Sequence, residues 1–91
     1  MNFMSIVGIV DAIKIKSKDE LLSIIYLKVD NVLYRSKLGQ LEYQIIPIKL
    51  NSQIFKRELK FLKPGAIVGI KGRIECFNSQ IDLLAERIKI F

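Results

Sequence analysis

The hydrophobic residues of this chain change their spacing near residue 65, and the two spacings predict different elements on either side. Between residues 51 and 63, large apolar side chains recur at helical spacing, with Phe61 beside them: Ile54, Phe55, Leu59 and Leu62. A helix is therefore predicted over 51–63, with Asn51 and Ser52 as candidate N-cap residues. It ends at Pro64-Gly65, because proline cannot continue a helix and glycine tolerates the turn.

Alternating apolar and polar residues predict five strands, over 5–16, 21–29, 41–50, 66–75 and 80–91, with 32–35 extending the second. Gly8 and Gly72 lie inside strands, where glycine marks a bend, a bulge or a close approach of two backbones. Pro47 requires a bulge or an edge position, because proline donates no ladder hydrogen bond. The period is disturbed at 84–86, which predicts a bulge, and 77–79 reads as a short hairpin loop.

The predicted elements follow the order strand, strand, strand, helix, strand, strand. Bent strands in this order, with one helix between the third and fourth, are typical of the OB-fold, an all-β five-stranded barrel. The 91 residues contain no internal repeat, linker or low-complexity segment, so one OB-fold domain over 1–91 is expected.

Hydrophobic residues make up 51% of the chain. This gives more apolar surface than the interior of one small barrel can bury. Several predicted strands are apolar on both faces, for example around Ile6, Ile9 and Ile24, and such strands need cover on both sides. A subunit interface is the simplest cover, so a homodimer is expected, with a homotetramer of paired dimers as its extension.

No apolar run approaches the length of a membrane span, and no signal peptide is visible. The single Cys76 cannot form an internal disulfide, which fits a reducing compartment, and it is expected to be a small buried or half-buried hydrophobe. These features predict a cytoplasmic protein that does not enter a membrane.

The formal net charge is +6, which fits a polyanionic partner such as nucleic acid, although a basic balance also aids solubility. The chain has no histidine, and one cysteine alone makes no plausible zinc site. Neither a phosphate-cradling glycine loop nor a nucleophile motif is present. No enzymatic activity, metal or cofactor is therefore expected.

Five segments carry a family resemblance: 5–8 (SIVG), 42–46 (EYQII), 58–65 (ELKFLKPG), 66–74 (AIVGIKGRI) and 83–88 (LLAERI). Together they resemble the bacterial single-stranded DNA-binding protein family, including its primosomal replication protein N relatives. The resemblance covers nearly the whole chain, and it implies dimers or tetramers with the first strand at the contact. The chain departs from the family in having no tryptophan, a longer segment at 51–62, and no flexible linker with an acidic tip.

Single strands are held by aromatic faces, on which bases stack, within a basic groove. Tyr43 matches the stacking aromatic that the resemblance implies on the third strand, and Tyr34 falls near the end of the second ribbon, where the family has another aromatic. Phe77, at the last hairpin, and Tyr26 are further candidates. Each of these four rings could instead pack in the core or in an interface, whereas Phe55 and Phe61 are predicted to be core residues.

Phosphate contacts are predicted for cations on the strands and on the loop after the first strand: Lys14, Lys16, Lys28, Arg35, Lys49, Lys71 and Arg73. Together with the aromatics they would line the strand and loop surface where OB-folds bind oligomers. The helix cations Lys56, Arg57 and Lys60 are expected to form a solvated face.

The sequence thus predicts an OB-fold protein that coats and protects single-stranded DNA in replication, recombination or repair, without strong sequence preference. Three alternatives stay open at this point. They are a primosomal accessory protein that also docks replication proteins, an RNA-binding OB module, and an OB domain whose aromatics serve only a protein interface.

Overall fold

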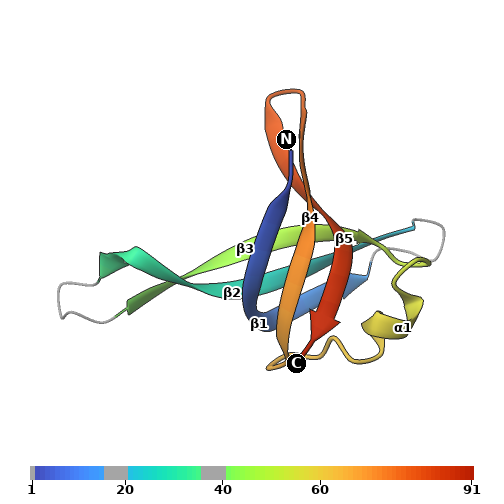
Figure 1. Ribbon diagram of the computed structural model, residues 1–91, viewed down its shortest axis with the longest axis horizontal. Coiled ribbons are helices and arrows are strands. Elements are labelled where there is room, and N and C mark those ends of the chain that lie inside the picture. Colours follow the sequence, from blue (N-terminus) through green and yellow to red (C-terminus); the bar gives the residue numbers. More distant parts are fainter. Residues whose placement is uncertain (1, 16–20, 36–40) are drawn as a thin grey trace.

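The strands close into one barrel with a single short helix beside it. The computed structural model describes residues 2–15, 21–35 and 41–91. The elements are β1 (Met4–Ile15), β2 (Leu22–Arg35), β3 (Leu41–Asn51), α1 (Lys56–Leu59), β4 (Ile67–Phe77) and β5 (Gln80–Ile90). The barrel has the strand order β1-β2-β3-β5-β4 (Figure 1). The predicted five-stranded OB-fold, with its helix between the third and fourth strands, is confirmed.

β1 is long and bent, and it belongs to both curved halves of the barrel. Its first part, from Met4 to Ile9, pairs with β4, and its second part, from Ile9 to Ile15, pairs with β2. The register shifts just after Val10. A side chain at Gly8 would come within 2.9 Å of the Lys28 carbonyl oxygen, so the glycine predicted to mark the bend also permits a close approach to β2.

A second irregularity lies between β4 and β5. Lys71 pairs with Arg87 and Gly72 pairs with Ala85, so Glu86 is the extra residue of a β-bulge. Gly72 is buried, and a Cβ atom there would overlap the Leu84 carbonyl oxygen. Both the predicted bulge at 84–86 and the close approach at this glycine are confirmed.

Alternation along the strands builds the core. The buried apolar side chains form one cluster: Met4, Val10, Ile25, Leu27, Ile48, Leu50, Phe55, Leu62, Val68 and Ile70. Ser23 is the one buried polar residue among the described side chains, and its hydroxyl lies 2.6 Å from the Ser52 hydroxyl. β3 pairs with β5 only at Lys49–Leu84 within the described ranges, so Pro47 has the edge position that the sequence required.

The predicted helix over 51–63 is wrong in extent, because α1 holds only the single turn Lys56–Leu59. The Asn51 side chain accepts hydrogen bonds from the backbone N–H groups of Gln53 and Ile54, so it stabilises a turn before α1. Ser52 does not cap, since its hydroxyl bonds to Ser23. One helical turn cannot keep the predicted apolar face together.

Two apolar side chains of this segment are therefore exposed. Phe55 and Leu62 are buried against the barrel, but Ile54 is 73% exposed and Phe61 is 61% exposed. The prediction of Phe61 as a core residue is wrong. None of the described helices has the length and hydrophobicity needed to span a bilayer.

The β4–β5 hairpin projects from the barrel (Figure 1). It turns at Asn78 and Ser79, which have φ values of 50° and 63°, as the two central residues of a type I′ turn require. Cys76 lies in this hairpin and is exposed, so its predicted burial is wrong. The reason is that, within the described residues, no further layer packs on the projecting part.

Candidate nucleic-acid interface

The outward side chains of β1, β2 and β3 form one continuous surface, which we call the Tyr43 face. Odd-numbered residues of β2, such as Ile25 and Leu27, are buried, so the even-numbered ones point outward. The strand register then aligns neighbours from β1 and β3 with them. The face comprises Ala12, Lys14, Ile24, Tyr26, Lys28, Asp30, Tyr43, Ile45, Pro47 and Lys49.

Tyr43 and Lys28 form a close pair towards one end of this face, where Tyr43 is paired with Asp30 across the strands. The Tyr43 side chain is 57% exposed although it lies within a strand, and the Lys28 Nζ atom sits 4.1 Å from the centre of its ring. An exposed cation–π contact contributes about 0.5–1 kcal/mol, which is less than the roughly 1–3 kcal/mol of a stacked base. A base stacked on this ring would therefore contribute more than the ammonium contact that it displaces.

Tyr26 lies in the middle strand of the same face and is half-buried. Its direct cross-strand neighbours are Ala12 on β1 and Pro47 on β3, and neither is charged. The ring therefore continues the uncharged part of the surface, next to the Lys28–Tyr43 pair. Tyrosine suits such a position because its ring is apolar and its hydroxyl can remain in water.

Lys14 and Lys49 lie on either side of Ile24, one strand away in each direction. Lys14 is exposed. The Lys49 Nζ atom lies 3.0 Å from an Asp82 carboxylate oxygen, and both side chains are about one-third exposed or less. The charge of Lys49 is thus largely balanced by Asp82 on β5, whereas no ion pair with a described carboxylate is seen for Lys14 or Lys28.

The structure does not bring Lys71 and Arg73 to the Tyr43 face, which corrects the sequence prediction. Lys71 points outward from the sheet of β1, β4 and β5, between Ser5 and Arg87. Arg73 belongs to the projecting hairpin, where its guanidinium group lies 3.0 Å from Glu75 and 3.8 Å from Glu86. Those two carboxylates already balance its charge.

Four predicted site residues cannot be placed on either surface. Lys16 lies outside the described residues. The backbones of Tyr34 and Arg35 belong to β2, and that of Phe77 ends β4, but their side chains lie outside the described part of the structure. Within the described ranges, no three histidine, cysteine or acidic side chains come together as a metal site.

Sequence reasoning missed two cations with suitable chemistry, Arg87 and Lys89, and left the role of the terminal Phe91 open between binding, a dimer contact and disorder. Arg87 and Lys89 alternate on β5, Phe91 continues this spacing just after the strand, and all three side chains are exposed on the second sheet. Their spacing of two is visible in the sequence and could have revealed the shared face. The bulge at Glu86, immediately before them, obscured the period.

No protein-family model and no curated protein sequence matches the chain. Its fold is nevertheless similar to that of solved OB-fold proteins. A small single-stranded DNA-binding protein from Streptomyces coelicolor superposes with a TM-score of 0.69 at 17% identity, covering 98% of this chain and 90% of the other. The dimeric N-terminal domain of PriB from Thermoanaerobacter tencongensis gives 0.64 at 21% identity, covering 99% and 96%.

A third similar structure is the Stn1–Ten1 complex from S. pombe, with a TM-score of 0.69 and 19% identity. All of this chain is covered, but it spans only 59% of that chain. At these identities the similarity establishes the OB-fold alone.

Proposed function

We propose that this protein binds single-stranded DNA on the Tyr43 face, largely without sequence preference. The observation that carries the proposal is the exposed Tyr43 ring with the Lys28 ammonium group 4.1 Å from its centre. A tyrosine that served only the core would be buried, whereas the Tyr43 ring is exposed and available for stacking. The Lys28 ammonium group adds a cation at the same place. The fold it shares with the Streptomyces single-stranded DNA-binding protein supports the same proposal.

Binding on this face would combine two interactions. Bases stack on Tyr43 and Tyr26, and every base offers a π-face, so stacking accepts any sequence. The phosphates between the bases contact Lys28 on β2 and Lys14 on β1, which belong to the same face as the two rings. The protein would coat and protect strands in replication, recombination or repair, and it would act by occupancy rather than by chemistry.

The main experiment is a competition measured by fluorescence anisotropy. A labelled single-stranded oligodeoxynucleotide is bound to the protein and displaced by unlabelled DNA strand, RNA of the same sequence, or duplex. The proposal expects the DNA strand to compete best and duplex worst. Stronger competition by RNA would make the chain an RNA-binding module, and no binding of any oligonucleotide would leave only a protein-interaction role.

Salt dependence tests the predicted phosphate contacts. On single strands, the slope of log affinity against log salt is about −0.7 per phosphate contact. The double variant Lys14→Ala/Lys28→Ala should therefore make the slope shallower by up to about 1.4. The matched control is Lys56→Ala/Arg57→Ala, which removes the same charge from exposed positions on α1. Equal slopes in both double variants would remove Lys14 and Lys28 from the phosphate path.

We also propose that the protein is a homodimer built along the first part of β1. Within the described ranges, residues 4–8 pair with β4 on one edge, and no strand pairs with their other edge. The outward side chain of Val7 on this segment is 62% exposed. Pairing the two copies of β1 would satisfy the open edge and extend the sheet into the partner.

Light scattering at micromolar concentration tests the dimer. Twice the 10.5 kDa mass of the chain is expected for the unmodified protein, and a mass of four chains would indicate paired dimers. Val7→Lys should shift the mass toward one chain, because like charges would meet across the two-fold axis. A single-chain mass for the unmodified protein would contradict the proposal.

A further inference from the structure

A second pair of a lysine and an exposed aromatic ring lies on the opposite sheet. The Lys89 Nζ atom is 5.3 Å from the centre of the Phe91 ring, and Phe91 is 67% exposed. Among the described residues, this pair and Lys28–Tyr43 are the two lysine–aromatic contacts. The side-chain combination that carries the proposed function therefore occurs twice, on two different faces of the barrel.

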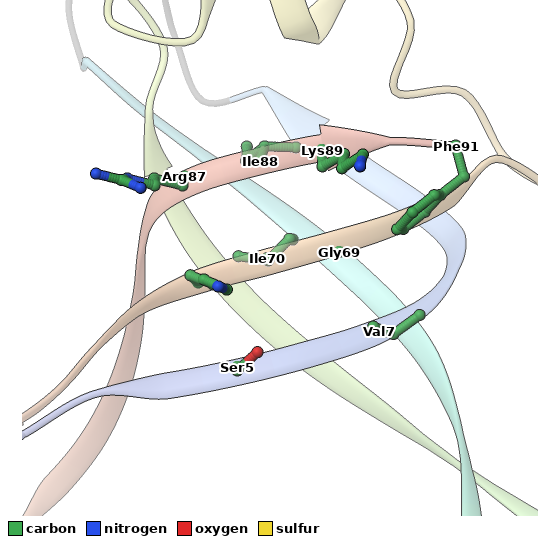
Figure 2. A pocket seen from close by; sticks show the side chains of 9 residues that line it. Ser5, Val7, Gly69, Ile70, Arg87, Ile88, Lys89 and Phe91 are labelled. Carbon is green, nitrogen blue, oxygen red and sulfur yellow. The ribbon is translucent and has the colours of Figure 1, made fainter.

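The surroundings of Phe91 form a shallow hollow on the outward side of β1, β4 and β5. Gly69 has no side chain to fill its place on β4, and a Cβ atom there would come within 3.3 Å of the Phe91 Cε2 atom and 3.8 Å of a Val7 methyl carbon. Figure 2 shows Phe91 and Val7 on either side of Gly69, with Arg87 farther along β5. The hollow has a volume of about 380 Å³.

The far end of the hollow is strongly cationic. Ser5, Lys71 and Arg87 are direct neighbours across the three strands, and both cations are exposed. Like charges directly opposite each other destabilise a sheet. Within the described residues no carboxylate lies within 4.0 Å of either cation, and the nearby Glu86 faces Arg73 instead. An anionic ligand would remove the repulsion.

We propose that this surface, the Phe91 face, is a second contact for the same single strand of DNA. A base stacks on Phe91 over the Gly69 hollow, and the neighbouring phosphates lie at Lys71 and Arg87. The bent β1 contributes outward residues to both faces, Lys14 to the first and Ser5 to the second, so one strand can pass from one to the other. This inference rests on the proposed function and adds a second half to its site.

Charge distinguishes a nucleic acid from a second copy of the chain as the occupant. Packing two Phe91 faces together across a two-fold axis would bring Lys71, Arg87 and Lys89 of both copies into one interface. Charged groups buried without partners are costly, whereas phosphates supply the missing negative charge. The proposed dimer joins two copies of β1 edge to edge and reaches the Phe91 face only at Val7 on its margin, so Phe91, Lys71 and Arg87 stay available to a second ligand.

The chain has no tryptophan, so the fluorescence of a single introduced tryptophan reports only on the surroundings of that residue. Two single-tryptophan variants are made, Tyr43→Trp and Phe91→Trp, and each is titrated with oligothymidines of about 6 and about 30 nucleotides, since one OB-fold covers about 4–16. The short oligomer should quench Tyr43→Trp only. The long oligomer should quench both variants at the same stoichiometry.

Two results would overturn the second contact while leaving the first intact. One is a Phe91→Trp signal that the long oligomer does not change although Tyr43→Trp is quenched. The other is a Phe91→Trp indole that is already shielded from a small added quencher in the DNA-free dimer, because a second copy would then cover the face. If neither variant responds to either oligomer, the proposed function itself fails.

A charge-reversal pair gives an independent readout. Lys71→Glu/Arg87→Glu should lower affinity for the long oligomer by about tenfold or more and leave the short oligomer nearly unchanged. Lys56→Glu/Arg57→Glu imposes the same change of net charge on α1, which contributes no residue to the hollow, as the matched control. An equal loss in both double variants would mean that net charge alone matters, and this would overturn the assignment of the Phe91 face.

Discussion

Tyr43→Ala is expected to weaken binding of single-stranded DNA by about 1–3 kcal/mol, a loss of about five- to 150-fold, while the barrel stays folded. The loss is large because the ring supplies the most exposed stacking surface of the Tyr43 face. The fold survives because the side chain is 57% exposed and removing it opens no cavity in the core. Affinity is measured by titration with oligothymidine, and folding by circular dichroism and thermal melting.

Phe61→Ala is the matched control for this prediction. Phe61 is also an exposed aromatic, at 61%, but it follows α1 and lies outside the Tyr43 face. Its removal should leave the affinity unchanged. A folded Tyr43→Ala variant that binds as tightly as the Phe61→Ala variant would take Tyr43 out of the site.

Gly72→Ala should destabilise the protein by about 3 kcal/mol or more, and it should unfold a barrel of this size under mild conditions. The added Cβ atom would overlap the Leu84 carbonyl oxygen and press on the Leu84 and Ala85 backbone. These atoms lie at the β-bulge where β5 pairs with β4. Removing the overlap therefore requires the two strands to move apart. Urea unfolding followed by circular dichroism measures the loss.

Gly69→Ala is the comparison for this second prediction. Gly69 lies three residues earlier on β4, and the atoms nearest to its added Cβ atom would be those of the flexible Phe91 ring, at 3.3 Å, and a Val7 methyl carbon. A ring on an exposed side chain can move aside, so the change in stability should stay below about 1 kcal/mol. Similar stability of the two variants would show that the backbone contact at Gly72 is not a tight one.

The order of elements was readable from the sequence because strand alternation is a direct consequence of one-sided burial. Val68 and Ile70 face the core while Ile67 and Lys71 face outward, as the period of two requires. The length of the helix was not readable. Apolar residues at helical spacing continue past the single turn of α1, and only the packing of Phe55 and Leu62 on the barrel decides which of them are buried.

The candidate site was predictable in part. Alternation, aided by the family resemblance, identified Tyr43, Tyr26 and Lys28 as outward residues, and the barrel brings these three together. Periodicity along one strand shows which residues point outward. It does not show on which side of the closed barrel those residues lie. Lys71 was therefore assigned to the wrong surface.

Two other predicted phosphate ligands, Arg73 and Lys49, form ion pairs with carboxylates, and no pattern in the sequence indicates these contacts. Arg73 contacts Glu86, thirteen residues farther along the chain, because the β4–β5 hairpin places them on neighbouring strands. Lys49 contacts Asp82 because β3 meets β5 when the barrel closes. Both ion pairs depend on the tertiary structure rather than on local spacing.

The most direct test of the account maps the DNA on the folded protein. Isotope-labelled protein is titrated with a short oligothymidine, and the backbone amide signals are followed by nuclear magnetic resonance. The largest changes are expected at outward positions of β2 and β3, from Ile24 to Lys28 and from Tyr43 to Lys49. An unchanged spectrum, or changes confined to α1 and the projecting hairpin, would contradict single-strand binding on the Tyr43 face.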